Sequence, residues 1–461
     1  MKPVAPGEVI YRESPYVHVV SDKELKNHCS SCFKSASSLK HCSRCKLLRY
    51  CNSSCQKADW SIHKQECPFF IDVVPEVLSE SIRMLLRIII RYQNGDHTKM
   101  ISTDPYWKRS FSDLMSHLER MQQDELRCKQ FAHVLSILSK VLEGSEVLPP
   151  VPQLWEFFGK MVINSYSIHD ELHENVIGSG VYLGASYLDH QCCPNAIVSF
   201  SGTKLAIRAL EPITQPLPNQ VFISYIQNDA PSWERREELL QRYYFRCLCS
   251  MCTTDAEQTD KQMTSVKCFM ANCDGFTGIK EINNDGYCQL WPCVKCKVIE
   301  FPTEYVDEVC QLWLETRKFV KDLNKMFESG EIQNALDSAE ENLKKVENSL
   351  FHESNLNIVS TMAIAKDACI SLQLWEKAAV YSEKVLKQVP QYSSCINIMD
   401  SLSLLKLAKL YIYLDRPTET VQVLDKCEKM VRVTHGEDSA LHQQTRNLQQ
   451  QCNMLLSMHC K

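Results

Sequence analysis

The sequence lacks the long apolar runs that a membrane protein needs. No stretch approaches the ~20 consecutive apolar residues of a transmembrane helix, and the best candidate, residues 84–90, is short and flanked by Arg83 and Arg91. The first eight residues contain no apolar signal core, so we expect no secretion and no membrane partner. The sequence also has no phosphate-cradling glycine loop, no Ser/His/Asp set and no paired-carboxylate signature. Nothing in it therefore indicates phosphate binding or a nucleophilic triad.

Neither sign of charge dominates the chain. It has 51 basic and 56 acidic residues among 461, a net charge of −5, which argues against a general nucleic-acid coat. Hydrophobic residues make up 44% and charged residues 23%, an ordinary globular balance. The length predicts roughly two to four domains.

Cysteine is abundant, with 24 residues. In a reducing compartment, cysteines at short fixed spacings are typical of metal ligands. Residues 29–67 hold eight such candidates, and because a structural zinc ion takes four ligands, eight predict two closed zinc sites. The candidates are Cys29, Cys32, Cys42, Cys45, Cys51, Cys55, His63 and Cys67.

This segment resembles the MYND zinc finger, through Tyr50-Cys51 and Gln56-x3-Trp60-x2-His63-x3-Cys67. The resemblance implies interleaved sites, with Cys29, Cys32, Cys51 and Cys55 on one zinc and Cys42, Cys45, His63 and Cys67 on the other. It also implies binding of proline-rich peptides. Seven basic and two acidic residues give the segment a local charge of +5. That charge fits either an acidic peptide or DNA backbone, or merely a solvated face; without a groove-reading helix, we do not expect DNA binding to be its primary role.

Hydrophobic periodicity predicts helices over residues 77–92, 111–121 and 131–142, and we expect a further helix over 155–168. The proline-rich run 148–152 is typical of a linker. Short β-rich runs follow at residues 178–183, 196–200, 205–209 and 221–225, separated by Gly, Pro and Asn. Short strands interrupted by such turn-forming residues favour an irregular β-domain over a doubly wound sheet.

Two motifs in this β-rich region carry a second resemblance. The run 189–195, Asp-His-Gln-Cys-Cys-Pro-Asn, is similar to the Asn-His-Ser-Cys-x-Pro-Asn signature of SET-domain methyltransferases, and the triplet Cys247, Cys249 and Cys252 is similar to their post-SET zinc site. A MYND finger set into a SET domain is characteristic of the SET- and MYND-domain-containing (SMYD) protein-lysine methyltransferases, which the chain resembles over nearly its whole length. The resemblance implies a third zinc held by Cys192, Cys247, Cys249 and Cys252. We expect Cys193 to be a buried core thiol instead.

The implied architecture is an α+β multidomain chain, in which a β-rich SET domain is split by the finger and a helical insert. The expected segments are 1–28, the N-terminal part of the SET domain without its first strand and glycine loop; 29–67, the MYND finger; 68–152, the helical insert; 153–228, the SET core; 229–256, the post-SET zinc segment; 257–302, a zinc-ribbon-like insert; and 303–461, an all-α tetratricopeptide-like C-terminal domain.

Ribbon-like spacing predicts a fourth zinc in residues 257–302, on Cys268, Cys273, Cys293 and Cys296. Cys288 is an alternative ligand, and surface thiols are the alternative to a metal site. The remaining cysteines are expected to be core thiols: Cys128, Cys193, Cys288, Cys310, Cys369, Cys395, Cys427, Cys452 and Cys460.

The resemblance further implies methyl transfer from S-adenosylmethionine to a neutral lysine amine. It assigns catalytic roles to Tyr225 and Tyr243, and cofactor binding to Asn164, Ser186, Leu188, Asp189, His190, Tyr225 and Phe245. Taken alone, Tyr225 is an ordinary half-buried strand tyrosine and His190 a core histidine. The sequence departs from the family pattern in three places. The glycine loop is missing, Asp189 stands in place of asparagine, and residues 215–220 stand in place of Gly-Glu-Glu. These departures keep open a second hypothesis, a catalytically weak or inactive scaffold that binds peptides and recruits partners.

The C-terminal third is expected to be helical from about Tyr305. Two weakly similar segments, 372–379 and 414–421, lie 42 residues apart and suggest stacked helix pairs. Residues 303–461 hold 18 basic and 22 acidic residues, which fits either an acidic surface for a lysine-bearing substrate, such as a histone, or an ordinary solvated surface. We expect a monomer in cytoplasm and nucleus.

Overall fold

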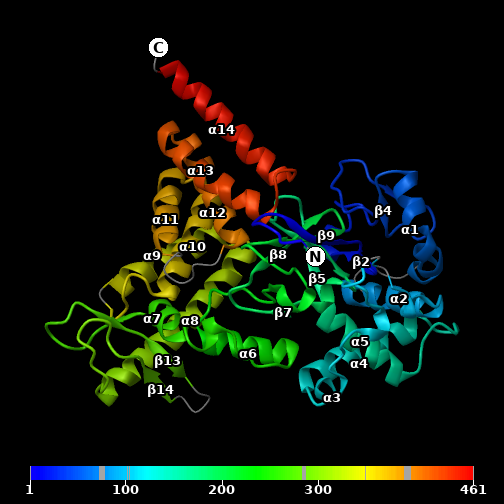
Figure 1. Ribbon diagram of the computed structural model, residues 1–461, viewed down its shortest axis with the longest axis horizontal. Coiled ribbons are helices and arrows are strands. Elements are labelled where there is room, and N and C mark those ends of the chain that lie inside the picture. Colours follow the sequence, from blue (N-terminus) through cyan, green and yellow to red (C-terminus); the bar gives the residue numbers. More distant parts are fainter. Residues whose placement is uncertain are drawn as a thin grey trace.

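The computed structural model describes residues 2–71, 78–100, 102, 104–282, 287–347, 349–388 and 396–459. Figure 1 shows a β-rich centre with the finger and the first helices on one side and a stack of C-terminal helices on the other. Every described strand is short, as predicted from the β-rich runs that Gly, Pro and Asn interrupt. The mixed helix and sheet content agrees with an α+β chain.

Two three-stranded antiparallel sheets form the centre. The first has the order β1-β9-β8 and the second β2-β6-β5, so that β2 is an edge strand. A short parallel pair, β7 and β10, lies beside them. The bounds are β1 Val9–Glu13, β2 Val17–Val20, β5 Ser165–His169, β6 Val176–Val181, β7 Asp189–His190, β8 Ala196–Ser201, β9 Lys204–Ala209 and β10 Phe222–Ile223.

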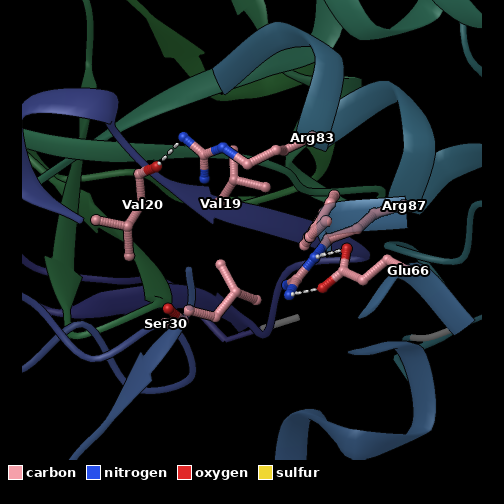
Figure 2. Close-up of a pocket in the computed structure, with 8 residues that line it drawn as sticks. Val19, Val20, Ser30, Glu66, Arg83 and Arg87 are labelled. Atoms are coloured by element: carbon pink, nitrogen blue, oxygen red, sulfur yellow. Dashed lines mark hydrogen bonds and ion pairs between the residues drawn. The ribbon is translucent and has the colours of Figure 1, made fainter. Parts of the chain in front are cut away.

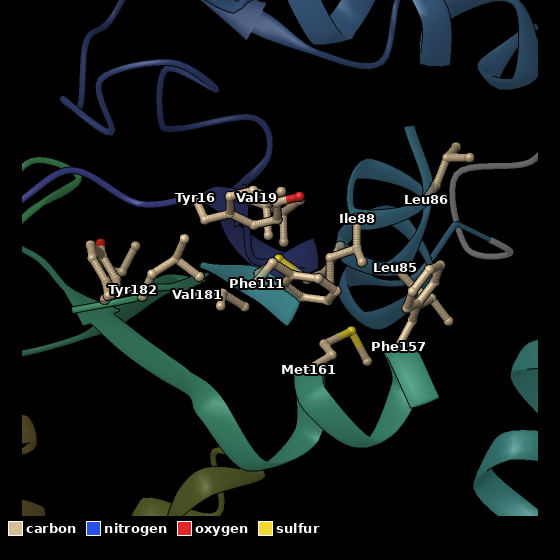
Figure 3. Close-up of a cluster of buried hydrophobic side chains, with 14 of the residues drawn as sticks. Tyr16, Val19, Leu85, Leu86, Ile88, Phe111, Phe157, Met161, Val181 and Tyr182 are labelled. Carbon is tan, nitrogen blue, oxygen red and sulfur yellow. The ribbon is translucent and has the colours of Figure 1, made fainter. Parts of the chain in front are cut away.

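The helix α2, Glu80–Gln93, is buried between β2 and the helix α5, Val151–Asn164. It contains the apolar run 84–90, whose side chains are all buried, so that run forms core. Figure 3 shows side chains of α2 meeting Phe111, Phe157 and Met161 in this cluster, with Val19 and Val181 from the sheet. Helix α4, Glu125–Val141, packs on α2. In the described part of the chain, no helix combines the length and apolar character needed to cross a bilayer.

Two of the expected helices are wrong in extent. Residues 111–121 hold a 3-10 turn, Phe111–Asp113, and the single turn α3, Leu118–Met121. The carboxylate of Asp113 accepts the backbone N–H of Ser110, which closes the first turn, and His117 interrupts the helix with a left-handed φ of 49°. The helix expected over 155–168 ends at Asn164, and residues 165–169 pair with β6 instead. Strand pairing, a tertiary contact, decides the conformation there. Val77, the start of another expected helix, lies outside the described residues.

The finger, residues 29–67, is built from a two-stranded hairpin and one helix, and it packs on α2 through that helix. The bounds are β3 Lys40–His41, β4 Arg49–Tyr50 and α1 Ser53–Glu66. Farther along the chain, α6 Ser232–Tyr243 and α7 Ala256–Met263 precede the small strands β11 Val266–Lys267, β12 Phe276–Thr277, β13 Ile279–Ile282 and β14 Cys288–Leu290.

The C-terminal region is helical, as predicted, and its helices pack in sequence (Figure 1). Leu372 and Leu414 directly follow α10 and α12 and have nearly the same backbone angles. The next residues, Gln373 and Asp415, have left-handed φ values of 59° and 53°. The 42-residue similarity therefore corresponds to a repeated helix–turn–helix unit. The bounds are α8 Thr303–Glu328, α9 Ile332–Glu347, α10 Leu356–Ser371, α11 Trp375–Gln388, α12 Ile398–Tyr413, α13 Pro417–Thr434 and α14 Ala440–His459.

Candidate metal centres and active site

The fold gathers the predicted metal ligands into four clusters. In each, the four ligand atoms lie within 4.8 Å of one another. A tetrahedral zinc ion with Zn–S bonds of about 2.3 Å places its sulfur ligands about 3.8 Å apart. Cluster 1 is Cys29, Cys32, Cys51 and Cys55; cluster 2 is Cys42, Cys45, His63 and Cys67; cluster 3 is Cys192, Cys247, Cys249 and Cys252; and cluster 4 is Cys268, Cys273, Cys293 and Cys296.

Clusters 1 and 2 interleave within the finger, in the arrangement that the MYND resemblance implied. In cluster 1 the Cys32 and Cys51 sulfurs are 3.7 Å apart, and Asn52 caps α1 by accepting the backbone N–H of Cys55. In cluster 2 the Nε2 atom of His63 lies 3.7 Å from the Cys45 sulfur. These spacings fit two closed zinc sites made from one hairpin and the two ends of one helix.

Cluster 3 joins two distant segments. The Cys192 sulfur lies 3.5 Å from that of Cys252 and 4.0 Å from that of Cys247. Arg235, fully buried on α6, donates from Nη2 to the Cys252 sulfur at 3.5 Å, a favourable contact for a thiolate. A metal here ties residues 247–252 to the end of β7.

Cluster 4 lies between the small strands, with sulfur separations of 3.7 Å for Cys268–Cys296 and for Cys273–Cys293. A Cβ at Gly275 would meet the sulfurs of Cys293 and Cys273 at 3.0 and 3.2 Å, so this tight cradle requires glycine. Cys288 is not in this cluster; it is buried and hydrogen-bonds with Cys310 instead.

Two expectations about the other cysteines need correction or remain open. Cys193 is exposed although its neighbour Cys192 is buried, so the expectation of a core thiol was wrong. Cys128 is only half-buried. Cys288, Cys310, Cys369, Cys427 and Cys452 are buried, as expected. Cys395 and Cys460 lie outside the described residues.

The predicted catalytic tyrosines lie together in an aromatic group beside cluster 3. The rings of Tyr225 and Tyr243 have centroids 4.9 Å apart, and Phe245 lies 6.3 Å from Tyr225 and 6.0 Å from His190. The Tyr225 hydroxyl donates to the backbone carbonyl of Leu188. Burial raises the pKa of Tyr225, so its hydroxyl stays protonated at neutral pH.

His190 connects this aromatic group to cluster 3. Its Nδ1 accepts the backbone N–H of Tyr225 at 3.0 Å, so the proton of the neutral ring is on Nε2, which lies 3.3 Å from the Cys192 sulfur. Burial lowers the pKa of His190 to about 4, which keeps the ring neutral at pH 7. The short parallel pair of β7 and β10 sets this arrangement by aligning His190 with Ile223.

The other predicted cofactor residues differ in exposure. Asn164 is buried, and its amide donates to the carbonyls of Met115 and Lys160 at 2.9 and 2.7 Å. Ser186 is half-buried, Leu188 is buried, and the side chain of Asp189 is exposed. The structure therefore joins Leu188, His190, Tyr225, Tyr243 and Phe245 by direct contacts. Asp189 lies between Leu188 and His190 in the chain, Ser186 pairs with Arg109, and Asn164 bonds to Met115 and Lys160.

Three residues near this region were not found from the sequence. Arg109 donates to the carbonyl and hydroxyl oxygens of Ser186 at 2.7 and 3.1 Å, and Tyr166 donates to the carbonyl of Ala185 at 2.9 Å. Buried Glu13 accepts the backbone N–H groups of Gly184 and Ala185, both at 2.9 Å. These residues come from the N-terminal strand, the helical region and β5, and no sequence motif links them to residues 184–186.

Comparison with known proteins agrees with this architecture. A family model described as "MYND finger" matches residues 29–67. The N-lysine methyltransferase SMYD2-A of Xenopus laevis is 27% identical over 435 residues, covering 94% of this chain and 91% of the relative. The chain is therefore similar to SMYD methyltransferases over nearly its whole length.

Other relatives show the same similarity. Human N-lysine methyltransferase SMYD2 is 26% identical over 441 residues, covering 95% of this chain and 92% of that protein. The histone-lysine N-methyltransferase ASHR1 of Arabidopsis thaliana is 25% identical over 447 residues, covering 94% and 88%. The similarity to SMYD proteins thus extends through the aromatic group and the C-terminal helices, well beyond the finger. Together with the four cysteine clusters, the MYND match supports zinc binding.

Proposed function

We propose that this chain is an S-adenosylmethionine-dependent protein-lysine N-methyltransferase, acting on lysines of histones or other proteins through a split SET domain. This proposal rests on the contacts around Tyr225, where the tyrosine, His190 and the carbonyl of Leu188 meet beside cluster 3. Support comes from relatives named as lysine methyltransferases, which match over more than nine-tenths of the chain. The substrate is accordingly a lysine-bearing protein segment.

In this proposal, S-adenosylmethionine supplies the methyl group when it is bound. Asn164, Ser186, Leu188, Asp189, His190, Phe245 and the ring of Tyr225 would hold it. The hydroxyl proton of Tyr225 is committed to the Leu188 carbonyl, so the lone pairs of the hydroxyl oxygen are free to accept an N–H from a lysine amine. This contact would orient the amine, while the rings of Tyr243 and Phe245 reduce the polarity around it. A less polar surrounding lowers the pKa of a lysine and favours the neutral, nucleophilic amine.

The proposal includes four zinc ions: two in the finger, one in cluster 3 and one in cluster 4. The cluster 3 zinc would hold the segment containing Tyr243 and Phe245 against His190. We further propose a monomer that works in cytoplasm and nucleus, with the C-terminal helical region beside the substrate.

Calorimetric titration with S-adenosylmethionine tests the enzyme proposal directly. We expect binding with micromolar affinity and, with a lysine-bearing protein substrate, transfer of a methyl group detected by mass spectrometry. Absence of heat at millimolar cofactor, with all four zinc ions present by elemental analysis, would reject it.

A second candidate is a weak or inactive SMYD scaffold that binds peptides through its finger. It is favoured by Asp189 in the position of the signature asparagine, and by Trp60, which is 44% exposed on a finger of local charge +5. Retained binding of a proline-rich peptide in protein that binds no cofactor would support this candidate over the enzyme.

A further inference from the structure

Three arginines of α2 form a ladder along the edge strand β2. Arg83, Arg87 and Arg91 are four residues apart and so lie on one face of the helix. Arg83 Nη2 donates to the carbonyl of Val20 at 2.8 Å and Arg87 Nη1 to the carbonyl of His18 at 2.9 Å. The guanidinium of Arg91 lies over the Tyr16 ring, 4.8 Å from its centroid. The ladder therefore binds α2 to two residues of β2, Val20 and His18, and to Tyr16, the residue before that strand.

Only the middle arginine of this ladder also binds the finger helix. Arg87 Nε and Nη2 donate to the two carboxylate oxygens of Glu66 at 3.0 and 2.7 Å, a bidentate ion pair. The same Nη2 donates to Asp59 Oδ2 at 3.0 Å. Figure 2 shows Arg87 and Glu66 facing each other and Arg83 reaching the Val20 carbonyl. One guanidinium thus contacts β2 and two carboxylates of α1.

Those carboxylates hold residues of the zinc-binding finger. Glu66 Oε1 lies 3.0 Å from Nδ1 of His63, whose Nε2 faces the cluster 2 sulfurs. Asp59 Oδ2 accepts the hydroxyl of Tyr50 at 2.8 Å, and the Tyr50 ring lies 6.0 Å from that of His63. A carboxylate on the second nitrogen of a zinc-ligating histidine fixes its tautomer and orientation. Arg87 in turn fixes that carboxylate.

This junction is almost dry. Arg87 is 2% exposed, and Glu66 and His63 are fully buried. A cavity of about 10 Å³ lies between β2, the finger and α2, lined by Val19, Val20, Ser30, Leu48, Glu66, Phe70, Arg83 and Arg87; that volume holds about one water molecule. Removing one partner from such a buried pair leaves the other charge unpaired in a low-dielectric site, which is strongly destabilising.

We infer that Arg87 couples zinc binding at cluster 2 to the packing of edge strand β2, acting as a positioning residue for the ligand His63 through Glu66. Loss of zinc frees His63, which loosens Glu66. Because Glu66 positions Arg87, the hydrogen bond from Arg87 to the carbonyl of His18 weakens as well. Conversely, loss of the Arg87 fork loosens His63 and speeds zinc release. The inference rests on zinc binding by the finger and does not depend on methyl transfer.

The test compares Arg87→Lys with Arg83→Lys in the full-length zinc-loaded protein. Both positions are on α2, each is 2% exposed, and each arginine donates to a β2 carbonyl, but Arg83 pairs with Asp22 and contacts no finger carboxylate. A lysine keeps the charge but cannot bridge two carboxylates and a carbonyl with a planar fork. Zinc release to a chelator is followed with a metallochromic dye, and the exposed thiols are mapped by alkylation and mass spectrometry.

In Arg87→Lys, we expect alkylation of Cys42, Cys45 and Cys67 to proceed about ten- to hundred-fold faster, the usual effect of removing such an outer partner. In Arg83→Lys, the same thiols should react at the wild-type rate. Equal rates in the two variants would overturn the inference.

If Arg87→Lys does not fold, Glu66→Gln takes its place in the comparison with Arg83→Lys. Glutamine keeps the shape of the side chain but removes the charge that pairs with Arg87. The reciprocal measurement is hydrogen exchange of β2 amides in Cys45→Ser, which loses a cluster 2 ligand. Faster exchange at Val17–Val20 supports the coupling, whereas wild-type protection there contradicts it.

Discussion

The ring of His190 accepts the backbone N–H of Tyr225 at 3.0 Å, across 35 residues of sequence. The opposite nitrogen of the same ring lies 3.3 Å from the sulfur of Cys192, a cluster 3 ligand. A single neutral imidazole thus links the tyrosine proposed to orient the substrate amine to the cluster proposed to bind zinc. Geometry at the tyrosine therefore depends on the integrity of that cluster.

Replacing Tyr225 with phenylalanine should lower turnover about ten- to hundred-fold with little change in cofactor affinity. The variant keeps the ring packing against Tyr243 but loses the oxygen that orients the amine. Turnover is measured by mass spectrometry of the methylated substrate, and folding by thermal unfolding. Tyr305→Phe is the matched control, because it also removes a hydroxyl bonded to a backbone carbonyl, that of Lys267, but on α8. Wild-type turnover in Tyr225→Phe would show that another residue orients the amine.

Replacing Asp189 with asparagine should tighten binding of S-adenosylmethionine by about two- to tenfold, the value of one hydrogen bond. The aspartate repels the carboxylate of the cofactor and lacks an amide donor, and asparagine corrects both. Its side chain is exposed, so the change should not affect folding. Asp189→Ala separates the two effects because it removes the charge without adding a donor. Calorimetric affinities equal to wild type would place this side chain away from the cofactor.

Replacing Cys249 with serine should remove one zinc ion and abolish cofactor binding. Without the metal, the segment holding Tyr243 and Phe245 is no longer tied to Cys192. Native mass spectrometry counts the bound zinc, and calorimetry measures the cofactor. Cys128→Ser is the control, since Cys128 is half-buried on α4 and belongs to none of the four clusters. An unchanged zinc count in Cys249→Ser would mean that the cluster does not bind metal as proposed.

Acid should destabilise the contact between the sheet region and the C-terminal helices. His169, His173 and His435 form a chain of rings with centroid separations of 4.8 Å. Burial, with the neighbouring rings of His435 and His169, lowers the pKa of His173 to about 2. Burial, with the nearby charge of Arg208, lowers the pKa of His435 to about 4, and Asp170 opposes such a shift only at His169. Both folded-state pKa values lie below the usual 6.5, so stability is complete above that pH and falls as the unfolded chain takes up protons.

Each of these two histidines should cost about 1.4 kcal/mol per pH unit between pH 6.5 and its own folded-state pKa. Urea unfolding at pH 7.5 to 4.5 measures the slope. His173→Asn removes one titrating ring and suits the left-handed backbone at this position, φ 56°. The variant should show a shallower slope than wild type, and because zinc loss in acid affects both proteins, the difference isolates the histidine. Parallel curves would contradict the prediction.

The metal ligands were largely predictable from local sequence. A Cys-x2-Cys pair brings its two sulfurs together whatever the rest of the fold does, so spacing alone identified the eight ligands of the finger. The pairing into clusters 1 and 2 came from resemblance, because interleaving depends on how the hairpin of β3 and β4 lies across α1. The repeated turns after α10 and α12 were likewise visible as a 42-residue similarity.

The extents of several elements were not predictable. Residues 165–168, Ser-Tyr-Ser-Ile, follow directly on the apolar helix α5, yet they form a strand because β6 offers a row of backbone partners. Arg109, Tyr166 and Glu13 carry no local signal, since each acts on residues 184–186 from a distant part of the chain.

By itself, the sequence determined which residues can ligate metal and where helices alternate with short strands, because spacing and periodicity are properties of neighbouring residues. Only the tertiary structure decided that three arginines in an apolar helix serve an edge strand and a zinc-binding finger. From the sequence, Arg87 is one charge in a hydrophobic run, and its role exists only where β2, Glu66 and Asp59 converge on it. Burying a guanidinium is unfavourable unless its donors are satisfied, and partners from three segments can be supplied only by the assembled fold.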